Sequence, residues 1–263
     1  GQLVSIVRDD KEYLVGALKP NYYRALTDND IDYLNFVPPL IPVHPLYMWK
    51  KASDSVKTKV NLVHRYSHSA YIETTLSVMG LKDVKMTYMI YPDGKIDVTH
   101  EGTPNLQDML RFGTVLTMPR EFDNVRWYGR GPQENYIDRK TGARIAIHEM
   151  SVADMEHHYM RPQENGHRTD VRMMEITNEE GKELRFTKKG EKPFAINCHH
   201  YTVTDLDEAT HIHSLQHKDF TTVCIDLMQR GVGGDMPGAA CLREPNIMHA
   251  GTRYSYGFTI EVI

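Results

Sequence analysis

Two segments of this 263-residue sequence repeat the residues Pro-Gln-Glu-Asn, at positions 132–135 and 162–165. Each repeat carries a glutamate, Glu134 or Glu164. Hydrolysis of a glycosidic bond uses two carboxyl groups, about 5 Å apart in retaining enzymes and about 7–9 Å apart in inverting ones. The two glutamates could therefore be the acid and base of a glycosidase. Because spacing in sequence does not set a distance in space, two structural loops that repeat by coincidence are the alternative.

The first repeat lies in segment 127–139, which reads W-Y-G-R-G-P-Q-E-N-Y-I-D-R. Gly129 and Gly131 predict a tight reversal of the backbone that uses their freedom to adopt positive φ. Pro132 fixes φ directly after them, and Trp127 would form an aromatic base beneath the turn. The segment therefore predicts a shaped loop on a rigid sheet, which is where binding surfaces commonly lie.

Polar side chains close the same segment, namely Glu134, Asn135, Asp138 and Arg139. They could form the polar face of a binding corner. In the alternative, the corner is a buried turn whose Glu134 and Asn135 bond neighbouring backbone groups, since buried N–H and C=O groups need partners. Both interpretations make this segment a fixed structural motif.

The second repeat continues into another polar loop, which contains Glu164, Asn165 and Arg168. Arg168 and Arg172 could clamp a carboxylate or stack on an aromatic ring that binds a sugar, because the guanidinium group is planar and carries a fork of donors. The alternative is that these arginines are solvated side chains on a strand. We treat Glu164, Asn165 and Arg168 as candidate binding residues.

A glycine-rich loop at 231–235 reads G-V-G-G-D. A dinucleotide site would need a helix directly after such a loop, and the Met-Pro-Gly-Ala at 236–239 cannot open one well. Gly233 and Gly234 instead predict a close approach of the backbone to another group, with Asp235 presented at the tip. A plain glycine turn is the alternative.

Histidines and cysteines are candidate metal ligands. His211 and His213 would point to one face of a strand and could share a metal ion. No carboxylate or cysteine completes a recognisable ligand set around them, so we expect neither a metal site nor a cofactor. The three cysteines lack CxxC spacing, which argues against a disulfide framework, and we expect Cys198 and Cys224 in the core.

The composition is that of an ordinary globular protein, with 40% hydrophobic and 25% charged residues. A net charge of -4 argues against nucleic-acid binding, which needs a concentrated basic face. No apolar run approaches the ~18 residues that span a bilayer, so no membrane contact is expected. No signal peptide is visible, which leaves a cytoplasmic or a periplasmic location open. We expect a single domain over residues 1–263, cut from a longer chain.

Alternation of apolar and polar residues dominates from residue 57 onward, as half-buried strands require. Turn residues at 91–94 and 178–181 predict two β-hairpins. A short helix is expected at 46–52 and another at a capping box at 204–207, with a turn at 27–30 and no regular structure through the prolines of 38–45. Strands are expected at 59–64, 70–78, 84–91, 95–100, 114–118, 125–128, 143–150, 171–177, 183–187, 194–201, 211–216, 222–228 and 253–263. This pattern predicts an all-β protein, a large antiparallel sandwich.

Four of these segments resemble, in order and at similar spacing, the C-terminal domain of large bacterial β-galactosidases of glycoside hydrolase family two, which in some bacteria is a separate small chain. They are 27–31, 127–139, 162–166 with Arg168, and 231–235. The resemblance implies a β-supersandwich similar to the galactose mutarotase fold. It also implies a non-catalytic role, because the family's two catalytic glutamates belong to a separate (β/α)₈ barrel domain and this sequence lacks the repeating strand–helix pattern of a barrel.

The resemblance further implies partners and a substrate: the barrel and other domains of the enzyme, or a large subunit, and a β-galactoside or oligosaccharide. The family's domain reaches the active site by a loop just after its Gly-Gly-Asp, where a tryptophan stacks on the sugar. Here the corresponding residues 236–241 contain no tryptophan. A stacked aromatic ring contributes roughly 1 kcal/mol, so we expect a weaker or altered sugar contact.

Two alternatives to the β-galactosidase domain stay open. A free-standing aldose 1-epimerase would need a histidine and a glutamate together at the bottom of one cleft. A carbohydrate-binding module would need a row of exposed aromatic side chains.

Overall fold

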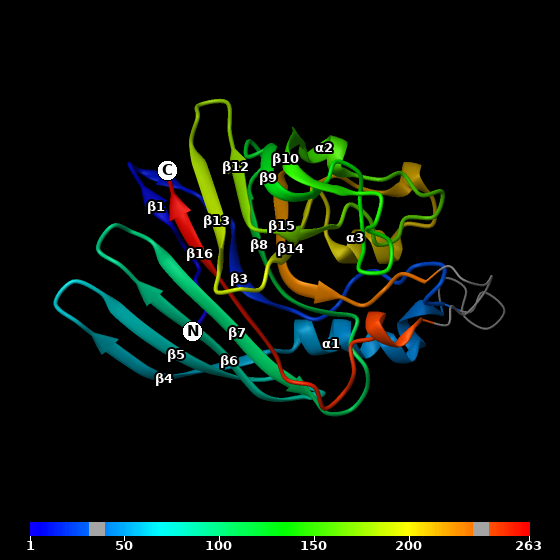
Figure 1. Cartoon of the computed structure of the whole chain (residues 1–263), viewed down its shortest axis with the longest axis horizontal. Helices are drawn as coiled ribbons and strands as arrows, with labels where there is room; N and C mark the ends of the chain where they lie inside the picture. The colour runs from blue at the N-terminus through cyan, green and yellow to red at the C-terminus, as the bar shows by residue number, and fades with distance from the viewer. Residues whose placement is uncertain (32–39, 234–241) are drawn as a thin grey trace.

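Two antiparallel sheets make up most of the molecule, which a computed structural model describes over residues 1–31, 40–233 and 242–263 (Figure 1). The larger sheet has nine strands, in the order β10 (Arg144–Ser151), β9 (Asn124–Gly131), β12 (Met173–Thr177), β13 (Glu183–Lys189), β16 (Tyr254–Val262), β7 (Ile96–Pro104), β6 (Leu81–Ile90), β5 (Ala70–Ser77) and β4 (Lys57–Arg65). The smaller has five, in the order β11 (Arg168–Val171), β14 (Phe194–His199), β15 (Phe220–Gln229), β8 (Arg111–Pro119) and β3 (Gly16–Asn21). The short strands β1 (Val7–Arg8) and β2 (Lys11–Glu12) pair with each other. The predicted all-β antiparallel sandwich is confirmed.

One face of each sheet contributes to the main hydrophobic core. On β8 and β15 the inward positions are apolar and include Phe112, Leu116, Val223 and Ile225. They belong to one cluster with side chains of the nine-stranded sheet such as Trp127, Met174, Phe186 and Phe258. Cys198 also lies in this cluster, as predicted. Cys224 is a buried free thiol too, but it lies on the opposite face of the five-stranded sheet.

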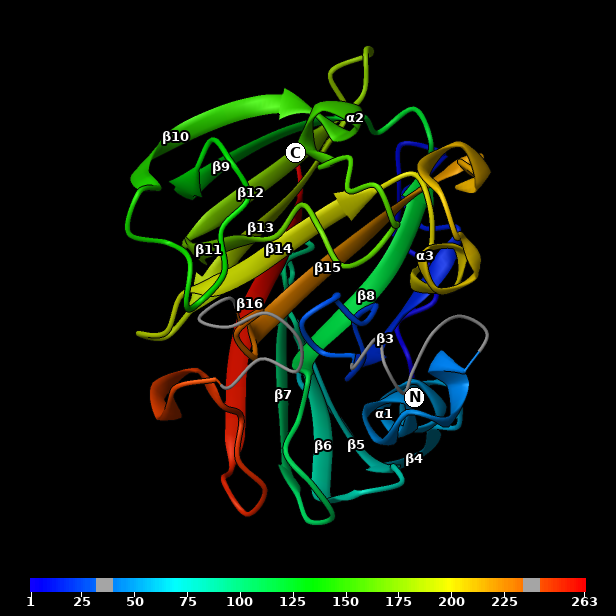
Figure 2. The same cartoon turned by 90° about the vertical axis from the view of Figure 1, so that its right-hand side faces the viewer.

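The opposite face of the five-stranded sheet is polar and yet largely buried. Arg111, Asn197 and Asp226 occupy it, each less than 5% exposed. Two short helices, α1 (Met48–Asp54) and α3 (Val203–Glu208), lie beside this face (Figure 2). Burial of charged groups is costly unless they are paired, so this face is where the fold has to satisfy polar groups most completely.

The helices are joined across this face by Lys50 of α1, whose Nζ lies 2.7 Å from Asp207 Oδ2 of α3. The remaining helical segments are α2 (Val152–Met155) and the 3₁₀ turns η1 (Ile41–Val43), η2 (Pro45–Tyr47), η3 (Ile212–Ser214) and η4 (Glu244–Asn246). None of the helices in the described ranges is long and apolar enough to cross a membrane.

Most of the local predictions agree with these elements. Both hairpins form, with Gly94 and Gly181 at positive φ in their turns. The helix at 46–52 is α1, displaced by two residues. Four predictions are wrong. The segment 211–216 contains η3 instead of a strand, and 3₁₀ turns occur at 41–43 and from residue 45. The capping box of α3 uses Thr202 and Asp205, and the strand expected at 171–177 is divided between β11 and β12, which belong to different sheets.

The expected glycine reversal at 129–131 is also wrong. Gly129 and Gly131 lie in β9 and neither has positive φ. The chain bends at 132–133, after the strand has ended, and forms a turn closed by the Tyr136–Arg139 bridge. Both positions require glycine because neighbouring atoms leave no space for a side chain. A methyl group on Gly129 would lie 2.9 Å from Val171 Cα, and one on Gly131 would lie 2.9 Å from the Trp127 ring. The polar loop can therefore pack closely on this strand.

Replacing Gly129 or Gly131 with alanine is expected to lower the free energy of unfolding by about 1–3 kcal/mol each, because the added methyl group overpacks a buried contact. Urea unfolding of each variant measures the change. Gly142→Ala is the matched control, since a methyl group there meets no atom within 4 Å. Equal stability of all three variants would show that the strand relaxes at no cost.

Candidate functional site

Four loops that are distant in sequence meet at the candidate site, and they contain the four segments singled out above. Gly233 N donates to Asp138 Oδ2 at 2.9 Å, which joins the glycine-rich loop to the first polar corner. Asn29 Nδ2 donates to Val232 O at 3.0 Å. Asp28 N in turn donates to Gln163 Oε1 at 2.9 Å. The described part of all four segments therefore forms one connected cluster, which we call the loop cluster.

The first Pro-Gln-Glu-Asn repeat packs against the residues that directly follow the second one. Glu134 Oε2 accepts a hydrogen bond from Gly166 N at 2.8 Å. Asn135 N donates to His167 O at 2.7 Å, and Asn135 Oδ1 accepts from Thr169 N at 2.9 Å. Glu134 and Asn135 thus satisfy backbone groups of the second loop, as the buried-turn interpretation requires.

Side chains on both sides of the first corner fix its conformation. Arg139 forms an ion pair with Glu134 Oε1, and Tyr159 OH donates to the same oxygen at 2.5 Å. Arg168 Nε donates to Pro132 O at 3.0 Å, and its guanidinium carbon lies 5.7 Å from the centre of the Trp127 ring. The corner is therefore fastened on both sides, with Trp127 as its buried base.

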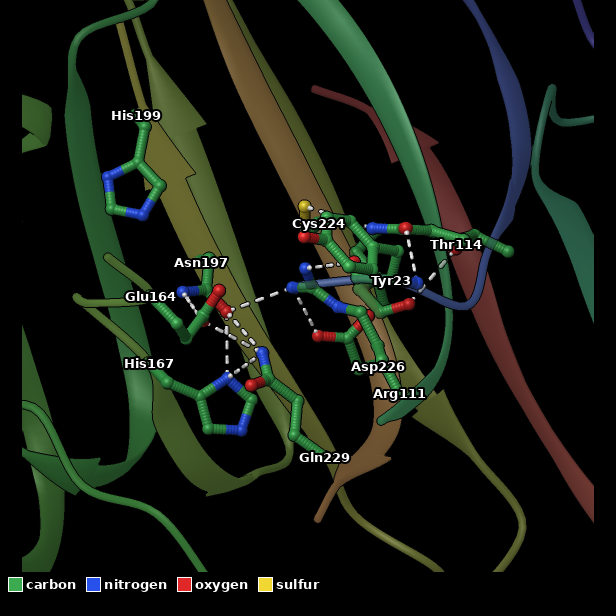
Figure 3. A network of polar contacts seen from close by, with 12 residues as sticks. Tyr23, Arg111, Thr114, Glu164, His167, Asn197, His199, Cys224, Asp226 and Gln229 are labelled. Atoms are coloured by element: carbon green, nitrogen blue, oxygen red, sulfur yellow. Dashed lines mark hydrogen bonds and ion pairs between the residues drawn. The ribbon is translucent and has the colours of Figure 1, made fainter. Parts of the chain in front are cut away.

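Glu164 of the second repeat turns toward the polar face of the five-stranded sheet (Figure 3). Its Oε1 accepts from Asn197 Nδ2 of β14 and from Gln229 Nε2 of β15, each at 2.9 Å. Asn197 Nδ2 also donates to Asn165 O at 2.7 Å. The second loop is thus tied to two strands of the sheet by side chains that are all buried.

A buried ion pair continues this network along the sheet (Figure 3). Arg111 of β8 donates from Nε to Asp226 Oδ1 at 2.9 Å and from Nη2 to Asp226 Oδ2 at 2.7 Å. Nη2 also donates to Asn197 Oδ1 at 3.1 Å. Burial alone would lower the pKa of Arg111, but the Asp226 carboxylate outweighs it and raises that pKa, so the arginine is charged.

Two buried histidines belong to the same region. His167 Nδ1 lies 2.7 Å from Asn197 Oδ1, and His199 Nε2 lies 3.1 Å from Asn165 O. Burial lowers the pKa of both imidazoles to about 3. Both rings are therefore neutral at neutral pH, and His199 donates its Nε2 proton to the Asn165 carbonyl.

A further buried pair anchors the glycine-rich loop. The Arg24 guanidinium lies 2.6 Å from Asp30 Oδ2, and its Nη2 donates to Gly231 O at 3.3 Å. The described part of the loop ends at Gly233, which has positive φ. Gly234, Asp235 and the segment 236–241, which lacks the family's tryptophan, lie outside the described residues. The substrate-side role of this loop therefore stays a prediction.

Several residues of the network were not anticipated from the sequence: Arg24, Arg111, Asn197, Asp226 and Gln229. A signal for some of them exists in the alternation. Asp226 is a charged residue in the otherwise apolar strand β15, and it lies on the same face of that strand as Thr222 and Cys224. A charged residue at a period-two position of a buried strand indicates a paired charge.

The two glutamates that could have formed a catalytic pair are committed to different partners. Glu134 bonds Arg139, Tyr159 and Gly166. Glu164 bonds the amides of β14 and β15. A glycosidase needs both carboxyl groups to face one sugar. This arrangement suits two carboxylates that brace loops.

Among the described residues, the exposed aromatic side chains do not form the row that a carbohydrate-binding module would need. They include Tyr66, Tyr91 and Tyr128, which belong to different strands or strand ends. Arg172 stacks on Tyr128, with its guanidinium carbon 5.5 Å from the ring centre. This arginine therefore packs on an aromatic ring of its own chain.

An aldose 1-epimerase would need a histidine and a glutamate whose proton-transferring atoms are free to meet the sugar in one cleft. Glu164 and His199 do line one cavity. However, His199 Nε2 and Glu164 Oε1 are both occupied by internal hydrogen bonds. These bonds favour a structural role for the two side chains.

Metal binding finds no support in the part of the chain that the structure describes. No group of three or more histidine, cysteine or carboxylate side chains there could hold an ion. His211 precedes η3 and His213 lies within it, and their rings stack with centres 5.3 Å apart.

Comparison with known proteins identifies relatives over the whole chain. A family model described as the β-galactosidase small chain matches residues 1–260. A β-galactosidase of Priestia megaterium is 33% identical over 265 residues, and one of Halalkalibacterium halodurans is 28% identical over 268. These alignments cover 99% of this chain but 25% and 26% of the two relatives. The chain therefore spans about a quarter of the length of the curated relatives it matches.

Solved structures similar to this chain include two sugar-enzyme structures from Lactobacillus acidophilus. A galactose 1-epimerase aligns with a TM-score of 0.49 and 8% identity, covering 100% of this chain and 88% of that one. A galactose mutarotase related enzyme aligns with a TM-score of 0.46 and 9% identity, covering 97% and 88%.

Proposed function

Because the chain belongs to the β-galactosidase small chain family, we propose that it is a non-catalytic domain of a β-galactosidase-type glycoside hydrolase. In this proposal the two catalytic carboxylates lie in a (β/α)₈ barrel domain outside these 263 residues. The whole enzyme cleaves terminal β-D-galactosides, and its barrel and other domains are the partners of this chain. The relatives named β-galactosidase support this substrate class, as does their length of about four times the matched region.

The observation that carries the proposal is the loop cluster. Segments around Asp28, Asp138 and Gln163 converge on the glycine-rich loop at 231–233 through backbone and side-chain hydrogen bonds. A protein uses this many buried polar contacts where a loop must keep one shape. The loop that they fix leads directly to Gly234 and Asp235, which we propose lie on the substrate side.

The proposed role follows from the chemistry of the barrel. A retaining glycosidase gains rate by holding the sugar in place and by excluding water from the reacting carbon. The open end of a barrel cannot exclude water alone, so a neighbouring domain has to cover it. Glu164, Asn165 and Arg168 brace the second loop from inside, which leaves Asp235 as the side chain proposed to meet the sugar. Because 236–241 contains no tryptophan, the contact of Asp235 with the sugar takes the place of the stacked tryptophan ring of the family.

The test uses the complete enzyme, with this chain and its barrel domain either fused or mixed as subunits. Asp235→Ala is expected to lower kcat/KM for nitrophenyl β-D-galactoside by about tenfold, because it removes about 1.4 kcal/mol of transition-state binding. The thermal midpoint should not change. Gly238→Trp should change the affinity for galactosides by restoring a ring on the same loop.

Two controls make this test decisive. Asp93→Ala alters an aspartate in the exposed β6–β7 turn and should leave kcat/KM unchanged. The 263-residue chain alone should give no hydrolysis above the reagent blank. Turnover by the isolated chain, with host enzyme excluded, would overturn the non-catalytic role. Wild-type kinetics of Asp235→Ala and Gly238→Trp would place the loop away from the substrate.

A further inference from the structure

A cavity of about 240 Å³ lies between the polar face of the five-stranded sheet and the helices α1 and α3. Its floor is formed by outward-facing residues of β8, β14 and β15, including Arg111, Asn197, His199 and Cys224. Glu164 borders it as well. At ~30 Å³ per water molecule it has room for about eight waters, or for one ring molecule of about a dozen non-hydrogen atoms.

The buried charged groups at this cavity are paired internally, and the exposed Lys19 and Asp54 at its edge carry opposite charges. Arg111 is paired with Asp226, and Lys50 is paired with Asp207. Neither buried cation is therefore free to hold a phosphate or carboxylate. Glu164 is likewise engaged by the amides of Asn197 and Gln229. The lining thus disfavours an ionic ligand, while its many donors and acceptors disfavour an apolar one.

Two aromatic side chains complete the lining. Tyr23 and Tyr201 both line the cavity, and both are almost completely buried. Tyr201 is stacked on His199 with ring centres 4.6 Å apart. Tyr201 also stacks on His217, with ring centres 5.8 Å apart, so its ring is held in place by two imidazoles. What the lining offers a ligand is a set of fixed polar groups between rigid ring edges, which suits a small neutral molecule with many hydroxyl groups.

Two buried polar atoms of this lining lack a hydrogen-bond partner, His199 Nδ1 and Thr222 Oγ1. Because neutral His199 donates its Nε2 proton to Asn165 O, its Nδ1 is an acceptor. Buried polar atoms are rarely left unpaired in a folded protein. Small movements of these side chains would bring both atoms to a hydroxyl group in the cavity.

We propose that this cavity binds one neutral monosaccharide, at a site that shares only Glu164 with the loop cluster. The inference does not depend on the proposed hydrolase function, because it rests on the cavity and its lining. It assigns the buried polar face of the five-stranded sheet a ligand of a stated class, a single pyranose ring.

Binding of D-galactose to the 263-residue chain, measured by calorimetry and ligand-detected NMR, tests the proposal. We expect saturable binding at one site per chain. The analogue 2-(hydroxymethyl)tetrahydropyran, which lacks the ring hydroxyl groups, should bind at least about tenfold more weakly, because it leaves buried partners unsatisfied. Equal binding of this analogue, or no binding of galactose, would overturn the proposal.

Filling the cavity locates the site. Val115→Phe adds a ring from β8 without touching the ion pairs, and Cys224→Met fills the floor from β15 if the first variant folds poorly. Either should weaken galactose binding by about tenfold or more. Val63→Phe, on the exposed strand β4, is the matched control and should bind as the wild type does. Wild-type affinity in folded Val115→Phe and Cys224→Met would place the sugar elsewhere.

Discussion

Asp226→Ala is expected to lower the free energy of unfolding by about 3–5 kcal/mol, the cost of leaving a buried charge without its partner. Arg111 donates two hydrogen bonds to Asp226, and neither side chain is more than 4% exposed. Without the carboxylate, Arg111 keeps only uncharged oxygens as acceptors, those of Tyr23 and Asn197. The loss is a large fraction of the stability of an ordinary domain, about 5–15 kcal/mol.

Urea unfolding of the wild type and of Asp226→Ala measures this difference. Asp93→Ala is the matched control, because it removes an aspartate whose lysine partner is exposed and should change stability by at most about 1 kcal/mol. The double variant Arg111→Met with Asp226→Leu should recover most of the loss, since no buried charge is left. A loss below about 1 kcal/mol in Asp226→Ala would show that water reaches Arg111.

Acidification from about pH 7.5 to about pH 5.5 is expected to remove about 4 kcal/mol of stability through three buried histidines. Burial lowers the pKa of His100, His167 and His199 to about 3 in the folded chain. Their ordinary pKa in the unfolded chain is about 6.5. Between these values the unfolded state binds more protons, so stability falls as the pH falls, by about 1.4 kcal/mol per pH unit for each histidine.

Unfolding free energies measured across this range test the sign and the size of the effect. Ordinary carboxylates titrate near pH 4, below this window. The buried carboxyl of Asp226 is an exception, because burial raises its pKa to about 6, and its proton uptake in the folded chain offsets a smaller part of the loss. His100→Gln keeps a partner for Tyr22 and should reduce the loss by about a third. His68→Gln, on the exposed β4–β5 turn, should reproduce the wild-type slope. Stability that is constant down to about pH 5.5 would contradict neutral buried rings.

The strands and hairpins could be predicted from the sequence because their signals are local. Alternation sets the two faces of a strand, and Gly94 and Gly181 mark turns through their own backbone freedom. The prediction of a strand at 211–216 is wrong because its signal is also local. A few alternating residues fit a strand and a 3₁₀ turn equally well.

The conformation of 127–139 could not be predicted locally. Its glycines are required by Val171 and His148, which are distant in sequence and approach only when β9 is paired. The same holds for the buried charges. Arg111 and Asp226 are separated by 115 residues, and nothing in either neighbourhood indicates its partner. The four segments of the loop cluster could be singled out by their residue types, and the resemblance linked them; their contacts explain why they occur together.

The loop cluster also constrains when the domain can become functional. Its hydrogen bonds join residues 95, 135 and 207 positions apart, and the last of these joins Arg24 to Gly231. Contacts of such long range form slowly, because the chain must close large loops before any contact repays the lost entropy. During synthesis Asp138 of the first polar corner therefore waits for 95 further residues to leave the ribosome before Gly233, its partner in the glycine-rich loop, is available. A neighbouring domain that recognises the cluster would in effect bind only chains whose two sheets are already assembled.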